Sequence, residues 1–137
     1  MPNLNDIMEM MDALETKAII TIPTFCVAVR NRHSSCRKCA DVCLADAFTI
    51  EKNELNIDAG ACVACGACVA VCPTSALVPM DPMPDDLAGA VAETTNAADG
   101  LTVIACARKA ARNVGDPDKY AVVHCLARLG EELLVAL

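Results

Sequence analysis

Ten cysteines dominate the chemistry that this 137-residue sequence can perform. Their spacing is densest in CVACGACVAVCP at 62–73, where three cysteines are separated by two residues each. A fourth follows after three more residues, and a proline comes next. Zinc sites usually draw on two separated pairs of ligands, whereas this run suits a cubane iron–sulfur cluster. The cysteines of the run are Cys62, Cys65, Cys68 and Cys72.

An incomplete copy of the run precedes it in RHSSCRKCADVC at 32–43. Shifted by 29 residues, the three cysteines of this copy align with the last three of the later run, and His33 aligns with Cys62. β-Rich stretches surround the two segments: AIITI at 18–22, a hairpin pattern at 48–58 and ALVPM at 76–80. The predicted order is therefore strand, cysteine segment, hairpin, cysteine segment, strand.

Residues 18–80 resemble the bacterial two-cluster ferredoxins, whose signature is this cysteine run in two halves. The resemblance implies an α+β, ferredoxin-like, pseudo-symmetric domain with two [4Fe-4S] clusters. In such domains the fourth cysteine of each run ligates the other cluster. The resemblance thus assigns Cys43, Cys62, Cys65 and Cys68 to one cluster, here cluster A, and Cys36, Cys39 and Cys72 to the second, cluster B.

The fourth ligand of cluster B has three alternatives. Cys26 follows a strand and Pro23, as the ferredoxin pattern expects of a first cysteine, so we favour Cys26 with an inserted loop at 27–35. His33 occupies the aligned position, and an imidazole can bind iron. An open corner would leave a [3Fe-4S] cluster or a solvent-exposed iron.

Four basic residues lie among the first cysteines: Arg30, Arg32, Arg37 and Lys38. A solvated basic loop is one interpretation. The other is tuning of cluster B, because nearby positive charge favours the reduced form of a cluster and raises its potential. The formal net charge of the chain, −7, disfavours nucleic acid as a partner.

The remaining segments are expected to position or extend this domain. Residues 1–17 predict an amphipathic helix that packs on the chain itself or on a partner. They lack a secretion signal, and no apolar run reaches the ~20 residues of a membrane span, so a cytoplasmic protein with reduced thiols is expected. Residues 81–100 predict a linker and a helix, and 101–137 a small α/β unit with two parallel strands.

Each expected strand of the 101–137 unit ends near a cysteine, Cys106 or Cys125. Each thiol is either a small buried hydrophobic group or half of a partner-facing or redox pair. Residues 101–137 resemble the small iron–sulfur subunits of hydrogenase and heterodisulfide reductase complexes, in an apolar strand ending in a cysteine followed by a second strand and HCLAR. Those subunits carry more cysteines.

The function indicated is electron transfer by two clusters, in a subunit or dedicated partner of a larger oxidoreductase complex. The sequence has no glycine-rich dinucleotide fingerprint, and two histidines leave few acid–base groups, so no catalytic site of its own is expected. A structural zinc or interaction module is one alternative. A thiol–disulfide protein using Cys106 and Cys125 is another, although neither lies in a C-x-x-C motif.

Overall fold

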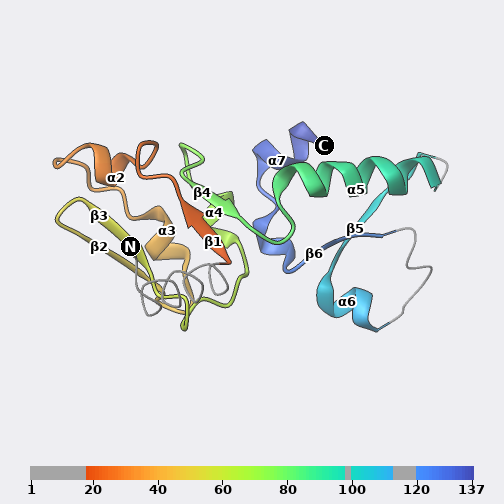
Figure 1. The fold of residues 1–137 in the computed structure, drawn as a ribbon, viewed down its shortest axis with the longest axis horizontal. Helices are drawn as coiled ribbons and strands as arrows, with labels where there is room; N and C mark the ends of the chain where they lie inside the picture. The colour runs from red at the N-terminus through yellow and green to blue at the C-terminus, as the bar shows by residue number, and fades with distance from the viewer. Residues whose placement is uncertain (1–17, 98–99, 113–119) are drawn as a thin grey trace, which may run out of the picture.

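The computed structural model describes residues 18–97, 100–112 and 120–137. The amphipathic helix expected at 1–17 lies outside these residues. Figure 1 shows two parts along the long axis of the molecule, with the cysteine-rich segment at one end and the C-terminal segment at the other. No helix among the described residues has the length and apolar character needed to cross a membrane.

The cysteine-rich part is built from short elements of three to five residues. The strands form two separate antiparallel pairs, β1 with β4 and β2 with β3. The hairpin predicted at 48–58 is confirmed, and its turn uses Lys52 and Asn53 at positive φ, the geometry of a two-residue hairpin turn. In chain order the elements are β1 (Ile19–Thr21), α2 (Val27–Arg30), α3 (Lys38–Val42), β2 (Phe48–Glu51), β3 (Glu54–Ile57), α4 (Ala67–Ala70) and β4 (Leu77–Pro79).

The two strand pairs repeat the same contacts. Phe48 pairs with Ile57 in one, and Leu77 pairs with Thr21 in the other. Just beyond these pairs the Asp58 N–H donates to the Ala47 carbonyl at 2.8 Å, and the Ile22 N–H donates to the Ala76 carbonyl at 2.7 Å. Phe48 and Leu77 differ by the 29 residues of the sequence repeat, so the repeat is also present in the backbone.

The core of this part is small. Ile19, Cys68 and Leu77 are buried together, and aliphatic side chains from the β2–β3 hairpin and from α3 and α4 pack around them. The half-buried Cys39 and Cys72 belong to the same cluster. Cysteine side chains therefore form part of the core itself, in a chain with few aromatic residues.

The C-terminal part has the expected parallel strand pair, with Val103 opposite Tyr120 and Cys106 opposite Val123. Helix α5 packs against β6, and Leu87, Ala121 and Val123 are fully buried between them. The helix of segment 81–100 thus shares a core with residues 101–137. The elements are α5 (Pro84–Ala97), β5 (Val103–Cys106), α6 (Ala107–Ala111), β6 (Tyr120–Val123), the 3-10 helix η2 (Leu126–Arg128) and α7 (Glu131–Ala136).

The two parts meet where η2 packs on α4 and where Gly130, just before α7, lies against Ala70. A Cβ added to Gly130 would lie 3.1 Å from the Ala70 carbonyl oxygen, so the two backbones are in close contact. The Ser75 hydroxyl donates to the Glu132 carboxylate at 3.1 Å across the same boundary. The C-terminal part therefore rests directly on the helix that carries Cys68.

Candidate metal centres

Four cysteines from three separate segments line one small cavity: Cys26, Cys36, Cys39 and Cys72. Most of its other walls are apolar side chains, including Val27, Ile50 and Leu77. The structure thus brings together the four residues that sequence reasoning placed around cluster B with Cys26 as first ligand. His33 is absent from the lining; it is exposed and its Nε2 accepts a hydrogen bond from Arg32 Nε at 3.2 Å.

Cys26 reaches this cavity because of its distance from β1. It follows Thr21 by five residues, as Cys62 follows Ile57, and these two strand residues occupy equivalent pairing positions. The extra residues of the first half therefore lie after Cys26, between it and Cys36.

The insertion begins with a helix rather than the expected loop. Helix α2 starts directly after Cys26 and buries Ala28. From the hairpin turn, Asn53 Nδ2 donates to the Ala28 and Val29 carbonyls, at 3.2 and 3.3 Å. These carbonyls at the end of a one-turn helix need partners, and a residue about 25 positions away supplies them.

Burial raises the pKa of the Cys39 thiol, and the neighbouring Cys26 and Cys36 thiols raise it further. Backbone N–H groups oppose this effect by stabilising the thiolate. Electrostatic coupling among these three thiols is consistent with their shared cavity. If all three were ionised, the neighbouring thiolates would repel one another, and a bound cation would offset this repulsion.

A second group of thiols surrounds Cys68. Burial raises the pKa of Cys68 to about 12, and the thiols of Cys65, Cys62 and Cys39 contribute in the same direction. A thiol so reluctant to ionise becomes a metal ligand only if the metal's positive charge compensates the thiolate. Since Cys39 belongs to the first group, the two groups lie next to each other.

Cys43 and Cys72 occupy equivalent places in the two halves. Cys43 Sγ accepts a hydrogen bond from the Ala47 N–H at 3.5 Å, and Cys72 Sγ accepts one from the Ala76 N–H at 3.3 Å. Asp46 and Ser75, each three residues after its cysteine, have positive φ values of 48° and 49°. Backbone donors of this kind stabilise a thiolate and restrict its orientation. Helices α3 and α4, which lead into the two cysteines, pack against each other.

The donors at both groups are all sulfur, and the walls of the Cys26 cavity are apolar. Soft thiolates in a dry setting suit iron–sulfur clusters and disfavour hard cations such as Mg²⁺ and Ca²⁺. In the part of the chain that the structure describes, no three His, Cys, Asp or Glu side chains converge on a single-ion position. A cubane requires its thiolates to be farther apart than the ligands of a single ion, because each thiolate binds a different iron. In donor type, the four thiols at one apolar cavity fit such a group.

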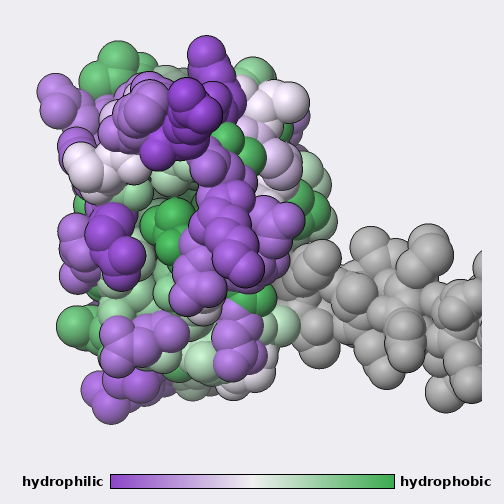
Figure 2. Space-filling view, turned by 90° about the vertical axis from the view of Figure 1, so that its left-hand side faces the viewer, coloured by the Kyte–Doolittle hydropathy of each residue, from purple (hydrophilic) through white to green (hydrophobic). Residues whose placement is uncertain are grey.

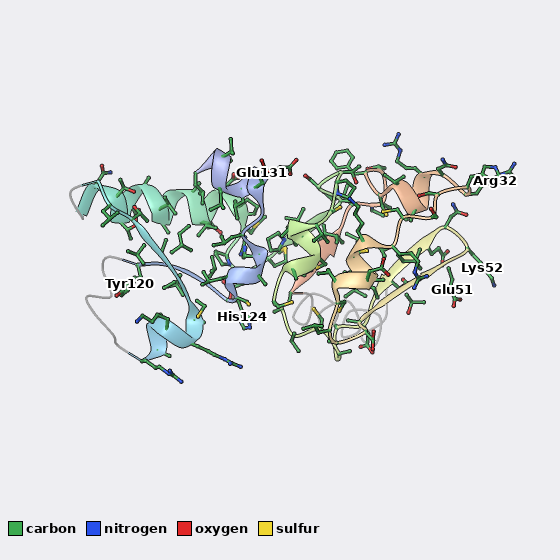
Figure 3. The ribbon with its side chains drawn as sticks, turned by 180° about the vertical axis from the view of Figure 1, so that it is seen from behind. Arg32, Glu51, Lys52, Tyr120, His124 and Glu131 are labelled. Atoms are coloured by element: carbon green, nitrogen blue, oxygen red, sulfur yellow. The ribbon has the colours of Figure 1, made fainter. Side chains whose placement is uncertain are left out.

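Of the four basic residues singled out in the sequence, Lys38 lines the Cys26 cavity. Arg37 Nε lies 4.0 Å from the Asp41 carboxylate on an exposed helix face. Arg30 is exposed at the end of α2, and Arg32 lies at the outer end of the molecule (Figure 3). Figure 2 views this end, where hydrophilic side chains cover most of the surface and small hydrophobic areas lie between them.

Sequence reasoning missed Arg128, which is 3% exposed at the boundary between the two parts. A Cβ on Gly66 would lie 2.5 Å from the Arg128 Cβ, so Arg128 packs directly on the loop between Cys65 and Cys68. The sequence signal was a lone arginine in HCLAR, and only the tertiary fold reveals its neighbour.

Cys106 and Cys125 both lie at the carboxyl ends of the parallel strands, as expected. Cys106 ends β5 opposite Val123, and Cys125 follows β6 by two residues. Both are half-buried free thiols, and the neighbouring His124 is exposed at the same edge (Figure 3). Their role stays open between small hydrophobic groups and a thiol pair.

Comparison with known proteins gives matches to the cysteine-rich segment. Residues 34–76 match the model of the 4Fe-4S dicluster domain family. A curated relative, "Ferredoxin 7Fe" of Hydrogenibacillus schlegelii, is 40% identical over 48 residues, which are 35% of this chain and 62% of that protein. A subunit of the ion-translocating oxidoreductase complex of Methanosarcina acetivorans is 45% identical over 42 residues, 31% of this chain and 16% of that protein.

The chain thus covers less than two thirds of either relative. No solved structure matches it significantly. Within the matched segment, the resemblance to two-cluster ferredoxins that the sequence indicated is confirmed by the family match and by the ferredoxin relative.

Proposed function

We propose that this protein is an electron-transfer protein with two iron–sulfur clusters. The observation that carries the proposal is the meeting of Cys26, Cys36, Cys39 and Cys72 at one largely apolar cavity, although they come from three segments. These four would hold cluster B. The ligands proposed for cluster A are Cys43, Cys62, Cys65 and Cys68.

The repeated backbone contacts support a pseudo-symmetric ferredoxin-like domain. Each half supplies a strand, a cysteine-bearing helix and a second strand, and each strand pairs with the other half. Cys43 and Cys72 end equivalent helices that pack on each other, which suits the exchange of one ligand between halves. Under this arrangement Cys26 is the counterpart of Cys62, and the insertion after it covers cluster B.

When bound, the clusters would accept and release single electrons. The chain's contribution is to exclude water and to set the charge around the sulfurs. Apolar side chains surround the Cys26 cavity, and the Ala47 and Ala76 N–H groups donate to cysteine sulfurs. Lys38 lines the cavity of cluster B, and we infer that its positive charge favours reduction there. The Cys39 thiol contributes to the raised pKa of Cys68, which supports two clusters near enough to exchange electrons.

We propose that the protein passes electrons to or from a partner in a larger redox complex. The Methanosarcina relative is named as a subunit of an oxidoreductase complex. Exposed apolar side chains flank three proposed ligands: Phe25 before Cys26, Leu44 after Cys43 and Val63 after Cys62. Apolar groups beside the clusters would let a partner dock where the electron path is shortest.

Anaerobic purification followed by iron and sulfide analysis and EPR tests the proposal. We expect about eight irons per chain and two cluster signals for the wild type. A total of about seven would instead assign a [3Fe-4S] cluster, the composition suggested by the name of the ferredoxin relative. A colourless protein containing stoichiometric zinc would overturn the proposal.

Two variants test the ligand assignment at cluster B. We expect Cys26→Ser to alter one cluster signal and to leave the other intact. His33→Ala is the control, because His33 is exposed and outside the cavity, and it should leave both signals unchanged. The assignment is wrong if Cys26→Ser changes neither signal, or if His33→Ala removes one.

A further inference from the structure

Arg128 is a buried cation without an ion-pair partner among the described residues. It is 3% exposed, and its Nη1 donates to the Pro82 and Asp81 carbonyls at 2.9 and 3.3 Å. Its Nε is buried and has no hydrogen-bond partner. The ion pair found in the described part of the chain joins Arg37 and Asp41 instead. Neutral carbonyls thus provide the polar contacts of this guanidinium.

Such a charge is costly to bury, because the folded protein must replace the water that stabilised it. Burial lowers the pKa of Arg128, and the charge of Asp81 partly opposes this effect. An arginine nevertheless remains protonated in proteins. The unliganded chain therefore leaves the cation only partly compensated.

The place of Arg128 identifies what would compensate it. A Cβ on Gly66 would lie 2.5 Å from the Arg128 Cβ and 3.4 Å from its Cα, so the arginine backbone touches the Cys65–Cys68 loop. Arg128 also lines a cavity at the boundary between the two parts, together with Cys72, a proposed ligand of cluster B, and with the acidic residues Glu131 and Glu132. A cubane ligated by four thiolates is anionic, about −2 when oxidised, and gains a further negative charge on reduction.

We propose that Arg128 is the electrostatic partner of cluster A, and that it raises the reduction potential of this cluster from the C-terminal part of the chain. The inference rests on the proposed function. It gives the C-terminal part a role at the redox centre besides any contact with other proteins. The packing of η2 on α4 holds the Arg128 backbone and Cβ against the Cys65–Cys68 loop, and its guanidinium reaches the Asp81 and Pro82 carbonyls.

EPR-monitored redox titration of the anaerobically purified protein tests the inference. Arg128→Met keeps an unbranched side chain and removes the charge. At a fixed ambient potential we expect the ratio of reduced to oxidised cluster A to fall about tenfold, which is ~59 mV for a one-electron couple. The reduction potential of cluster B should shift less. Its EPR signal is identified as the one that changes in Cys26→Ser. Arg128→Lys, which keeps a cation, should retain most of the wild-type potential of cluster A.

Two controls separate charge from structure. Gly130→Ala forces a Cβ against Ala70 at the same boundary and keeps the Arg128 charge, so it should lower stability without this shift. Arg37→Met removes an exposed cation and should leave the potential of cluster A unchanged.

An unchanged potential in Arg128→Met, with both clusters present, would overturn the inference and leave the proposed function standing. So would a shift of the same size in Gly130→Ala. If Arg128→Met fails to retain clusters, Arg128→Lys decides: near-normal cluster content and potential support a charge role, and failure of the lysine variant overturns it. A wild type that contains no iron and sulfide would instead refute the proposed function itself.

Discussion

Replacing Gly66 with alanine probes the contact that joins the cysteine loop to the C-terminal part. Gly66 has φ of +74°, a left-handed conformation that costs an alanine about 1–2 kcal/mol. The new Cβ would also lie 2.5 Å from the Arg128 Cβ, which is fixed to the backbone and cannot rotate away. Relieving such an overlap costs about 1–3 kcal/mol. The two effects together predict a loss of about 2–5 kcal/mol in the free energy of unfolding.

Other glycines of the chain separate the two contributions. Gly100 has φ of +86° but no atom within 4 Å of an added Cβ, so Gly100→Ala should cost only the strain, about 1–2 kcal/mol. Gly89 lies in α5 with open space around it, and Gly89→Ala should stabilise the protein by about 0.5–1 kcal/mol.

The assay is anaerobic guanidinium unfolding of the cluster-loaded proteins, monitored by far-UV circular dichroism. The unfolding midpoints are compared among variants whose unfolding free energy depends equally steeply on denaturant concentration. The expected order of stability is Gly89→Ala, wild type, Gly100→Ala and then Gly66→Ala. A Gly66→Ala variant no less stable than Gly100→Ala would refute the contact with Arg128. It would also remove the geometric basis for placing this cation beside cluster A.

Three further predictions concern the cysteine-rich part and the C-terminal thiols. Asn53→Ala removes two hydrogen bonds to α2, so stability should fall by about 1–3 kcal/mol and chelators should strip iron from cluster B faster; an unchanged stripping rate would contradict this. In cluster-free protein the folded state keeps the Cys68 proton between pH 9.0 and about 12 while the unfolded state releases it. Stability should therefore fall as pH rises through this window, and a fall of equal size in Cys68→Ala would show that another group causes it. Cys106→Ser should leave the iron content and both EPR signals unchanged, and loss of either would make Cys106 a ligand.

Local sequence was enough to single out the proposed ligands that lie close together in the chain. Cys62 and Cys65 lie in one short loop and Cys68 lies in the first turn of the helix that follows, so the local backbone keeps the three near one another. The hairpin at 48–58 was predictable for the same reason, since alternating strands and a two-residue turn are local features. The parallel pair near Cys106 and Cys125 also followed from two apolar runs.

The surroundings of Cys26 and Arg128, by contrast, depend on tertiary packing. Cys26 reaches the Cys72 cavity because β1 pairs with β4 from the far end of the segment, which the spacing of residues 26–43 does not encode. In the sequence, the repeat alignment placed His33 at this position, whereas the strand and Pro23 favoured Cys26. The fold places Cys26 at the cavity and His33 outside it, and the hairpin residue Asn53 donates to the start of the insertion between them. Arg128 meets Gly66 only because η2 packs on α4, which lies far from it in the chain. Contacts between distant segments depend on how the elements pack, and so local patterns leave them undetermined.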